Sequence, residues 1–241
     1  MAETELWRVD LETAGAALEA MQRDAPRLSA EELRRLGAIA NEEVRRERSM
    51  AYIALRILLE RRIGPAARET DFVRSPSGRP ALADGAVAFS LAHTQGLALI
   101  ALGNDPIGVD VERARDVRIP EARRGPIESE AVALAGGTPL CGEDADARFV
   151  AAWVRIEAAA KAVGTGVGPA LERLRPERWE QRRGPGAQNA AAPPVVVHDV
   201  VVADGVFAAI ALAPGETPPP LRALPQSAPA IAALLIEGTS R

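Results

Sequence analysis

Cysteine, histidine and aromatic residues are all scarce in this sequence of 241 residues, and each scarcity excludes a class of protein. One cysteine, Cys141, cannot form an intrachain disulfide, and with two histidines it cannot supply a Cys/His metal framework. Aromatic residues make up only 3% of the chain, too few for a surface that stacks nucleic-acid bases. The net charge of -4 also argues against general affinity for nucleic acid or for an anionic membrane.

Long apolar runs and a basic leader are missing as well. No segment approaches the length of apolar sequence that a bilayer span requires. Residues 1–15 are acidic and lack the basic and apolar regions of a secretory signal. We therefore expect a cytoplasmic protein without a membrane partner.

The sequence does contain enough apolar material for a sizeable core. Hydrophobic residues make up 47% and charged residues 26%, which suits one globular domain or two compact halves. Apolar periodicity and turn residues predict these elements: two helices within 29–63, three strands within 86–112, a short helix among loops in 114–147, a helix over 148–163, a flexible stretch over 182–194, an antiparallel hairpin over 195–215 turning at Asp204-Gly205, and a weak closing element at 231–238.

Two of the predicted strand segments are similar to each other. GLALIALGN (96–104) and GVFAAIALAP (205–214) are both apolar and are both entered from a turn glycine. This similarity favours two related halves joined near residues 113–145, although short apolar strands also resemble one another by chance.

Two carboxylates stand side by side in PIGVDVER (106–113). Strand side chains alternate with period two, so Asp110 and Glu112 share one face while Val109 and Val111 share the other. Like charges at that spacing repel each other unless water or a cation neutralises them. The plainer interpretation is a solvated face on an edge strand.

The helix predicted over 148–163 adds a third carboxylate. Trp153, Glu157 and Lys161 are spaced four residues apart and therefore lie on one stripe of that helix. A carboxylate among apolar neighbours needs a partner, which a lysine one turn away or a metal ion would supply. The alternative is an ordinary Glu–Lys pair on a helix surface.

Three carboxylates without a Cys/His set favour a hard cation such as Mg²⁺, which commonly binds together with substrate phosphates. A phosphorylated substrate is therefore the natural expectation. Residues that could contact its phosphates lie upstream of the carboxylates: Arg48, Arg56, Arg74, Ser75, Ser77, Arg79 and His93.

Taken together, four segments resemble one family, the 4'-phosphopantetheinyl transferases of the larger, surfactin-synthetase-activating type. The segments stand in family order within residues 45–165 and read GRPAL (78–82), FSLAHT (89–94), IGVDVE (107–112) and WVRIEAAAK (153–161). The resemblance implies an α+β fold that is a pseudo-dimer of two similar α+β halves. An N-terminal half over 1–112 and a C-terminal half over 113–241 would enclose the active site between them.

The resemblance also implies an activity, the Mg²⁺-dependent transfer of 4'-phosphopantetheine from coenzyme A to a serine of an apo carrier protein, with release of 3',5'-ADP. The carrier would be an acyl or peptidyl carrier of fatty-acid, polyketide or nonribosomal-peptide synthesis, and a monomer would hold a complete site. Asp110, Glu112 and Glu157 would hold Mg²⁺. Glu157, or a water it orients, would take the serine proton, and Lys161 would stabilise charge on the phosphates. The implied coenzyme A contacts are Arg79, His93, Thr94, Lys161 and either Arg48 or Arg56.

This sequence departs from the family's motifs at four positions. Arg79 replaces lysine and Thr94 replaces serine, which keeps the charge and the hydroxyl, whereas Ile156 and Ala92 replace a lysine and a serine and each remove a possible phosphate contact. One alternative is therefore a catalytically weakened homologue that binds coenzyme A or a carrier protein without turnover. Another is a different Mg²⁺-dependent phosphodiester enzyme such as a nuclease, against which the acidic balance and the few aromatics argue.

Overall fold

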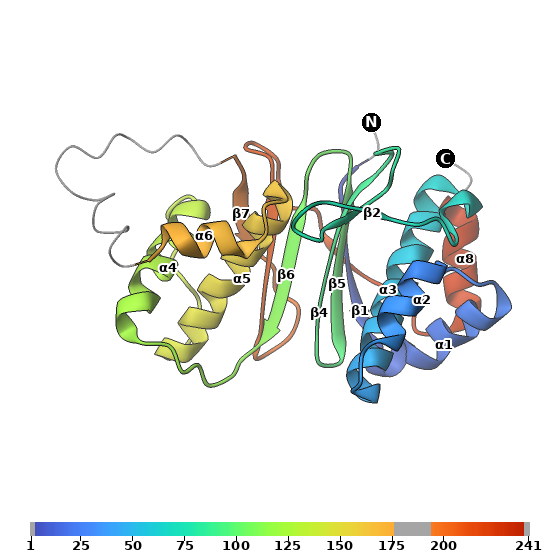
Figure 1. The fold of residues 1–241 in the computed structure, drawn as a ribbon, viewed down its shortest axis with the longest axis horizontal. Coiled ribbons are helices and arrows are strands. Elements are labelled where there is room, and N and C mark those ends of the chain that lie inside the picture. The colour runs from blue at the N-terminus through green and yellow to red at the C-terminus, as the bar shows by residue number, and fades with distance from the viewer. Residues whose placement is uncertain (1–2, 176–193, 239–241) are drawn as a thin grey trace. The chain divides into compact units, whose positions relative to one another are not determined.

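The computed structural model describes residues 3–175 and 194–238 and has a mixed α+β fold, as predicted. Its contacts divide the chain into two compact units, each described below by itself (Figure 1). The first unit comprises 1–73, 80–104 and 220–241, and the second comprises 74–79 and 105–219. The division differs from the predicted boundary after residue 112, because the strand over 108–113 pairs with the strand over 206–212 of the second unit and the C-terminal segment returns to the first.

The first unit is built on one four-stranded sheet. The order is β4-β5-β1-β9, in which only the β1–β9 pair is parallel. Its strands are β1 (Glu5–Asp10), β4 (Ala88–Thr94), β5 (Leu97–Gly103) and β9 (Leu221–Ala223). Its helices are α1 (Leu11–Asp24), α2 (Ala30–Gly37), α3 (Glu42–Ile63), the 3-10 turn η1 (Pro65–Ala67) and α8 (Ala228–Gly238). A separate two-residue ladder joins β2 (Val73–Arg74) to β3 (Pro80–Ala81).

The two helices predicted within 29–63 are confirmed, and their ends follow from the sequence. Ser29 opens α2 with a capping box, in which its hydroxyl accepts from Glu32 N–H and the Glu32 carboxylate accepts from Ser29 N–H. Asn41 caps α3, which ends at Gly64 with a φ of 83°. The closing element expected at 231–238 is part of the helix α8, whose Ile231 is fully buried in the core of this unit.

The second unit has a three-stranded antiparallel sheet in the order β6-β8-β7. The strands are β6 (Gly108–Arg113), β7 (Val196–Asp199) and β8 (Val206–Leu212), and the helices are α4 (Glu121–Leu134), α5 (Ala145–Val163) and α6 (Val167–Arg173). The predicted strands and the β7–β8 hairpin are confirmed, and α4 is the helix expected in 114–147. The flexible stretch predicted over 182–194 lies, up to residue 193, outside the described residues.

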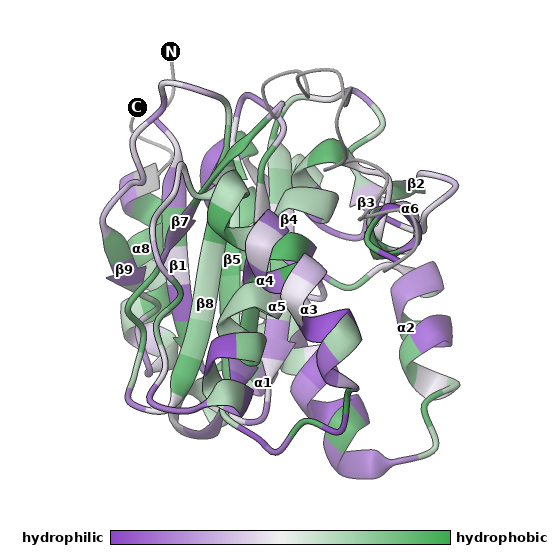
Figure 2. Cartoon of the chain, turned by 90° about the vertical axis from the view of Figure 1, so that its left-hand side faces the viewer, coloured by the Kyte–Doolittle hydropathy of each residue, from purple (hydrophilic) through white to green (hydrophobic). Residues whose placement is uncertain are grey.

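The similar segments 96–104 and 205–214 form β5 and β8, each an interior strand of its own sheet. Figure 2 shows both strands as largely hydrophobic. Their common origin by duplication stays a prediction. Among the described residues, no helix combines the length with the apolar composition needed to cross a bilayer.

Helix α5 supplies buried residues to two apolar clusters of the second unit. Asp144 caps its first turn by accepting from Ala147 N–H at 2.7 Å, and Gly164 ends it in the left-handed region with a φ of 79°. Small residues of α5 pack on small residues of the sheet, with Ala158 and Ala162 in one buried cluster with Ala209 and Ala211. Small side chains let a helix approach a sheet closely, so α5 lies near the backbone of β6.

Asp146 connects α5 to α4 and predicts a pH-dependent stability. Its carboxylate accepts from Arg124 Nη2 at 2.6 Å and from Val117 N–H at 3.1 Å, and these bonds hold the pKa of Asp146 below its ordinary value. The stabilisation is therefore present above the ordinary pKa and is lost as the pH falls through the lowered one. We expect Asp146→Asn to lower the urea midpoint at pH 7 and to unfold together with the wild type near pH 2. A midpoint difference that persists at low pH would show that charge is not the cause.

Candidate functional site

The candidate site of the second unit begins where β6 crosses α5. A Cβ added at Gly108 would lie 2.0 Å from the Ala158 carbonyl oxygen and 2.5 Å from the Ala162 nitrogen, so the strand backbone touches the helix backbone there. Only glycine permits this approach. By the two-residue period of the strand, Asp110 and Glu112 point to the same side as Gly108, toward α5.

Lys161 is the ion-pair partner of Asp110. Its Nζ lies 2.6 Å from Asp110 Oδ1, and the Asp110 side chain is only 9% exposed. The second carboxylate oxygen, Asp110 Oδ2, is buried and has no hydrogen-bond partner in the described structure. Asp110 is therefore not on a solvated face, and Lys161 reaches across to the strand instead of forming the ordinary helix pair with Glu157. An orphaned, buried carboxylate oxygen is costly and signals a missing partner.

The three predicted carboxylates act on one another electrostatically. Burial raises the pKa of Asp110, and the adjacent Lys161 ammonium only partly offsets this rise. Burial raises the pKa of Glu112 and of Glu157 as well, and the charge of Asp110 raises both further. Glu112 also faces the exposed Arg115 at 3.8 Å. The cluster thus holds more negative charge than its own cations neutralise.

The donor set suits a hard divalent cation. As the side chains stand, no group of three or more His, Cys, Asp or Glu residues in the described part of the chain is arranged to hold a metal ion. The Lys161 ammonium takes one oxygen of Asp110. The orphaned Oδ2, the all-oxygen donors and the raised pKa values nevertheless fit Mg²⁺, and Asp110, Glu112 and Glu157 are the residues that would hold it.

The GRPAL segment braces the end of α5. Arg79 donates from Nη1 to Ala162 O at 3.1 Å and from Nη2 to Ile107 O at 3.0 Å, and burial lowers the pKa of its guanidinium. Ser77 donates from its hydroxyl to Gly164 O at 2.8 Å. These bonds satisfy carbonyls at a helix C-terminus and fix the start of β6 beside it. Arg79 thereby positions both elements that carry the carboxylates.

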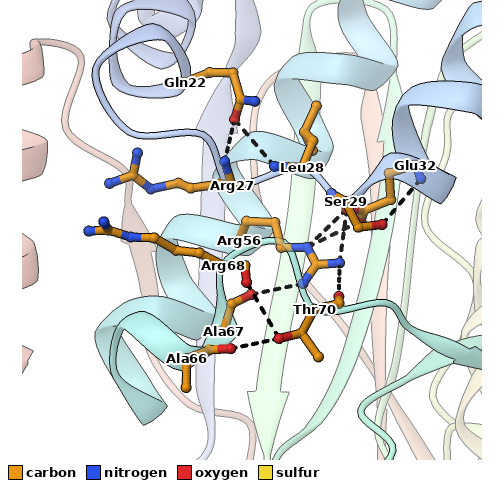
Figure 3. Close-up of polar contacts among 10 residues, drawn as sticks. All are labelled: Gln22, Arg27, Leu28, Ser29, Glu32, Arg56, Ala66, Ala67, Arg68 and Thr70. Atoms are coloured by element: carbon orange, nitrogen blue, oxygen red, sulfur yellow. Dashed lines mark hydrogen bonds and ion pairs between the residues drawn. The ribbon is translucent and has the colours of Figure 1, made fainter.

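In the first unit, Arg56 is a structural residue. Its side chain is fully buried, and Figure 3 shows its guanidinium enclosed by polar partners. It binds the Glu32 carboxylate at 2.9 Å, donates to the carbonyls of Ala67 and Thr70 at 2.8 and 2.6 Å, and stacks 3.8 Å from the Phe72 ring centroid. Arg56 is therefore buried and fully paired, and it is not available to contact a nucleotide.

The other residues of this unit that are predicted to contact the nucleotide are His93, Thr94 and Arg48. His93 and Thr94 end β4 and are half-buried, and the turn that follows is tied to α3 because Gly96 N–H donates to Glu47 Oε1 at 2.7 Å. Arg48 is the next residue of α3 and is exposed. Of the two helix arginines that the sequence left open, Arg48 is thus the one retained.

The two weakening departures both lie in buried positions. Ala92 is 6% exposed on β4, with its side chain on the face opposite His93, and Ile156 is 2% exposed. Ile156 packs in a buried apolar cluster with Phe149, Val150 and Leu174, against which Trp153 also packs. A lysine at position 156 would therefore enter the core and would not join the carboxylates.

A charge at position 156 should accordingly destabilise the second unit. We expect Ile156→Lys to lower the free energy of unfolding by about 3 kcal/mol, because an unpaired ammonium would be buried. Ile156→Met, a long chain without charge, should cost less than about 1.5 kcal/mol. Urea denaturation of the two variants checks this. Equal stability of both would mean that position 156 opens to solvent.

Sequence reasoning missed the positioning residues of this site. Gly108 was quoted within a motif, yet only the structure reveals its contact with the α5 backbone. Arg155 was likewise unassigned, and it anchors α5 by binding Asp199 at 2.8 and 2.6 Å. The sequence offers one sign of this role, because Arg155 stands among the apolar residues of the helical pattern over 148–163.

A scan against models of protein families finds none that matches the chain, and a search of curated proteins finds no match. The resemblance to a family thus rests on the four motifs of the sequence.

Proposed function

We propose that this protein transfers 4'-phosphopantetheine from coenzyme A to a serine hydroxyl of an apo carrier protein, releasing 3',5'-ADP. The observation that carries the proposal is the buried Asp110 carboxylate, which has one oxygen on Lys161 and the other without a partner, within electrostatic range of Glu112 and Glu157. Such a cluster suits a substrate that brings a divalent cation and phosphates to it. The four motifs, in family order, supply the identity of that substrate.

Mg²⁺, when bound by Asp110, Glu112 and Glu157, would neutralise charge on the pyrophosphate of coenzyme A. The reaction forms a bond from the serine Oγ to the phosphorus of the phosphopantetheine group. It breaks the bond from that phosphorus to the oxygen that leaves with 3',5'-ADP. The serine loses its proton in the same process.

Glu157 is the base that would accept this proton, directly or through a water. Its raised pKa favours this role, because a carboxylate with a higher pKa is a stronger base. Lys161, one helical turn away, would stabilise negative charge on the phosphates. In the first unit, His93, Thr94 and the exposed Arg48 would bind the nucleotide part of coenzyme A.

The weakened homologue is the alternative, and it rests on the departures from the family's motifs at Ala92 and Ile156. The transferase must bind both coenzyme A and a carrier protein and turn them over, whereas the weakened homologue binds coenzyme A or a carrier protein without turnover.

Chromatographic measurement of 3',5'-ADP separates them. The protein is incubated with coenzyme A and Mg²⁺, with an apo acyl carrier, with an apo peptidyl carrier or without either. Release that requires a carrier supports the transferase. Coenzyme A binding by calorimetry without release selects the weakened homologue, and release without a carrier indicates a hydrolytic phosphodiester enzyme.

A further inference from the structure

Two cationic side chains of α5, Arg155 and Lys161, each bind a carboxylate on a neighbouring strand. They differ in how many contacts hold them in place. Arg155 is 0% exposed, binds both oxygens of Asp199 and also donates to the carbonyls of Thr138 and Pro139 at 2.8 and 2.9 Å. Lys161 is 28% exposed and makes one bond, to Asp110 Oδ1. Arg155 is a fixed anchor, whereas Lys161 can leave its partner.

The backbone beneath Lys161 does not have to move for the side chain to leave. Gly164 ends α5 in a helix cap, and Ser77 and Arg79 hold the last carbonyls of the helix at 2.8 and 3.1 Å. The four-carbon stem of a lysine is flexible and its ammonium is readily hydrated. Rotation about the side-chain bonds is enough to carry the ammonium from Asp110 toward solvent.

The position that Lys161 occupies is also the one where a divalent cation would be most favourable. Asp110 is nine-tenths buried, its Oδ2 has no hydrogen-bond partner in the described structure, and Glu112 and Glu157 add negative charge around it (Figure 1 shows β6 beside α5). One ammonium satisfies only half of this carboxylate. A divalent ion could satisfy both oxygens.

We propose that Lys161 is a displaceable internal cation, which holds the place of the divalent ion beside Asp110 in the metal-free protein and is released when that ion binds. The released ammonium is then free to bind an anionic group of the substrate. This inference rests on the proposed function for the substrate, but its first step, exchange of a lysine for a metal ion, is independent of turnover. By linkage, metal and anion binding each strengthen the other.

Metal affinity in the absence of substrate tests the exchange directly. Binding of Mn²⁺ to the full chain is measured by electron paramagnetic resonance or calorimetry without coenzyme A. We expect Lys161→Met to bind Mn²⁺ about tenfold more tightly than the wild type, because a competing cation has been removed. Lys161→Arg should bind it several-fold more weakly, because an arginine can hold both oxygens of Asp110.

Arg115→Met is the matched control for loss of one positive charge. Arg115 is 54% exposed and lies 3.8 Å from Glu112, so its removal should change Mn²⁺ affinity by about twofold or less. Thermal unfolding gives a second readout: metal-free Lys161→Met should melt below the wild type, and Mn²⁺ should remove the difference. A lysine that merely braces the fold would leave a deficit that Mn²⁺ does not repair.

These measurements distinguish failure of the lysine–metal exchange from failure of the proposed function. Unchanged or weaker Mn²⁺ binding by Lys161→Met overturns the exchange, and if that variant does not fold, unchanged or tighter binding by Lys161→Arg overturns it instead. Failure of the wild type to bind Mn²⁺ overturns both the exchange and the metal site. Tighter binding by Lys161→Met in a protein that transfers nothing sustains the exchange and rejects only the proposed function.

Discussion

Glu157→Gln should lower the rate of phosphopantetheine transfer by about a thousandfold while leaving the fold intact. The amide has the shape of the carboxylate but cannot accept the serine proton, and general base catalysis contributes roughly two to four powers of ten. Glu157 is half-buried and glutamine has nearly the same size and shape, so the substitution removes no core packing. Transfer is measured by the mass of the carrier over time, and folding by circular dichroism.

The pH dependence of the transfer rate gives a second test of the role of Glu157. Because burial and the neighbouring Asp110 raise the pKa of Glu157, wild-type transfer should decline on acidification from a higher pH than an ordinary glutamate would give. That limb should be missing from the residual activity of Glu157→Gln. Glu121→Gln makes the same charge change at an exposed position of α4 and should transfer at the wild-type rate. Substantial activity in Glu157→Gln, with the acidic limb unchanged, would remove Glu157 from the chemistry.

Gly108→Ala should destabilise the second unit and, at the same time, separate Asp110 and Glu112 of β6 from Glu157 of α5. The added Cβ would lie 2.0 Å from the backbone oxygen of Ala158, which cannot rotate away as a side chain would. Either the strand or the helix must shift, and overpacking of this kind costs about 3 kcal/mol. The same shift separates Asp110 from Lys161, so Mn²⁺ binding and transfer should both be lost.

The matched control is Gly37→Ala in α2, an exposed helical position that no proline follows. A Cβ at this position meets nothing within 4 Å, and alanine favours a helix over glycine by up to about 1 kcal/mol. Urea denaturation should therefore show Gly108→Ala to be less stable than the wild type and Gly37→Ala to be at least as stable. A stable Gly108→Ala that still binds Mn²⁺ would show that close contact of β6 with α5 does not form the site.

The parts of the fold that were predictable are those with local periodicity. The helix α5 and the strands β4 to β6 follow from alternation and from turn glycines, since these patterns depend on residues near in sequence. The shared face of Asp110 and Glu112 followed from the strand period in the same way. What Lys161 would contact did not follow, because its pairing with Asp110 depends on how β6 crosses α5.

The choice between the two arginines of α3 illustrates the same limit. Arg48 and Arg56 are alike in sequence, and both stand among charged and apolar residues of one helix. Arg56 is buried because Glu32, from a separate helix, supplies a countercharge and the loop after α3 supplies carbonyls. The segment 74–79 is a further case, since a turn-rich stretch gives no sign that it will hold the end of a helix some 85 residues later.

The central claim is that this protein attaches phosphopantetheine to a carrier, and the intact mass of the carrier tests it most directly. An apo acyl carrier and an apo peptidyl carrier are each incubated with the protein, coenzyme A and Mg²⁺, with and without a chelator. The account predicts that at least one carrier gains the mass of one phosphopantetheine, at a serine, and that the chelator prevents the gain. Carriers of both kinds that keep their apo mass while the protein binds coenzyme A and Mg²⁺ would contradict it.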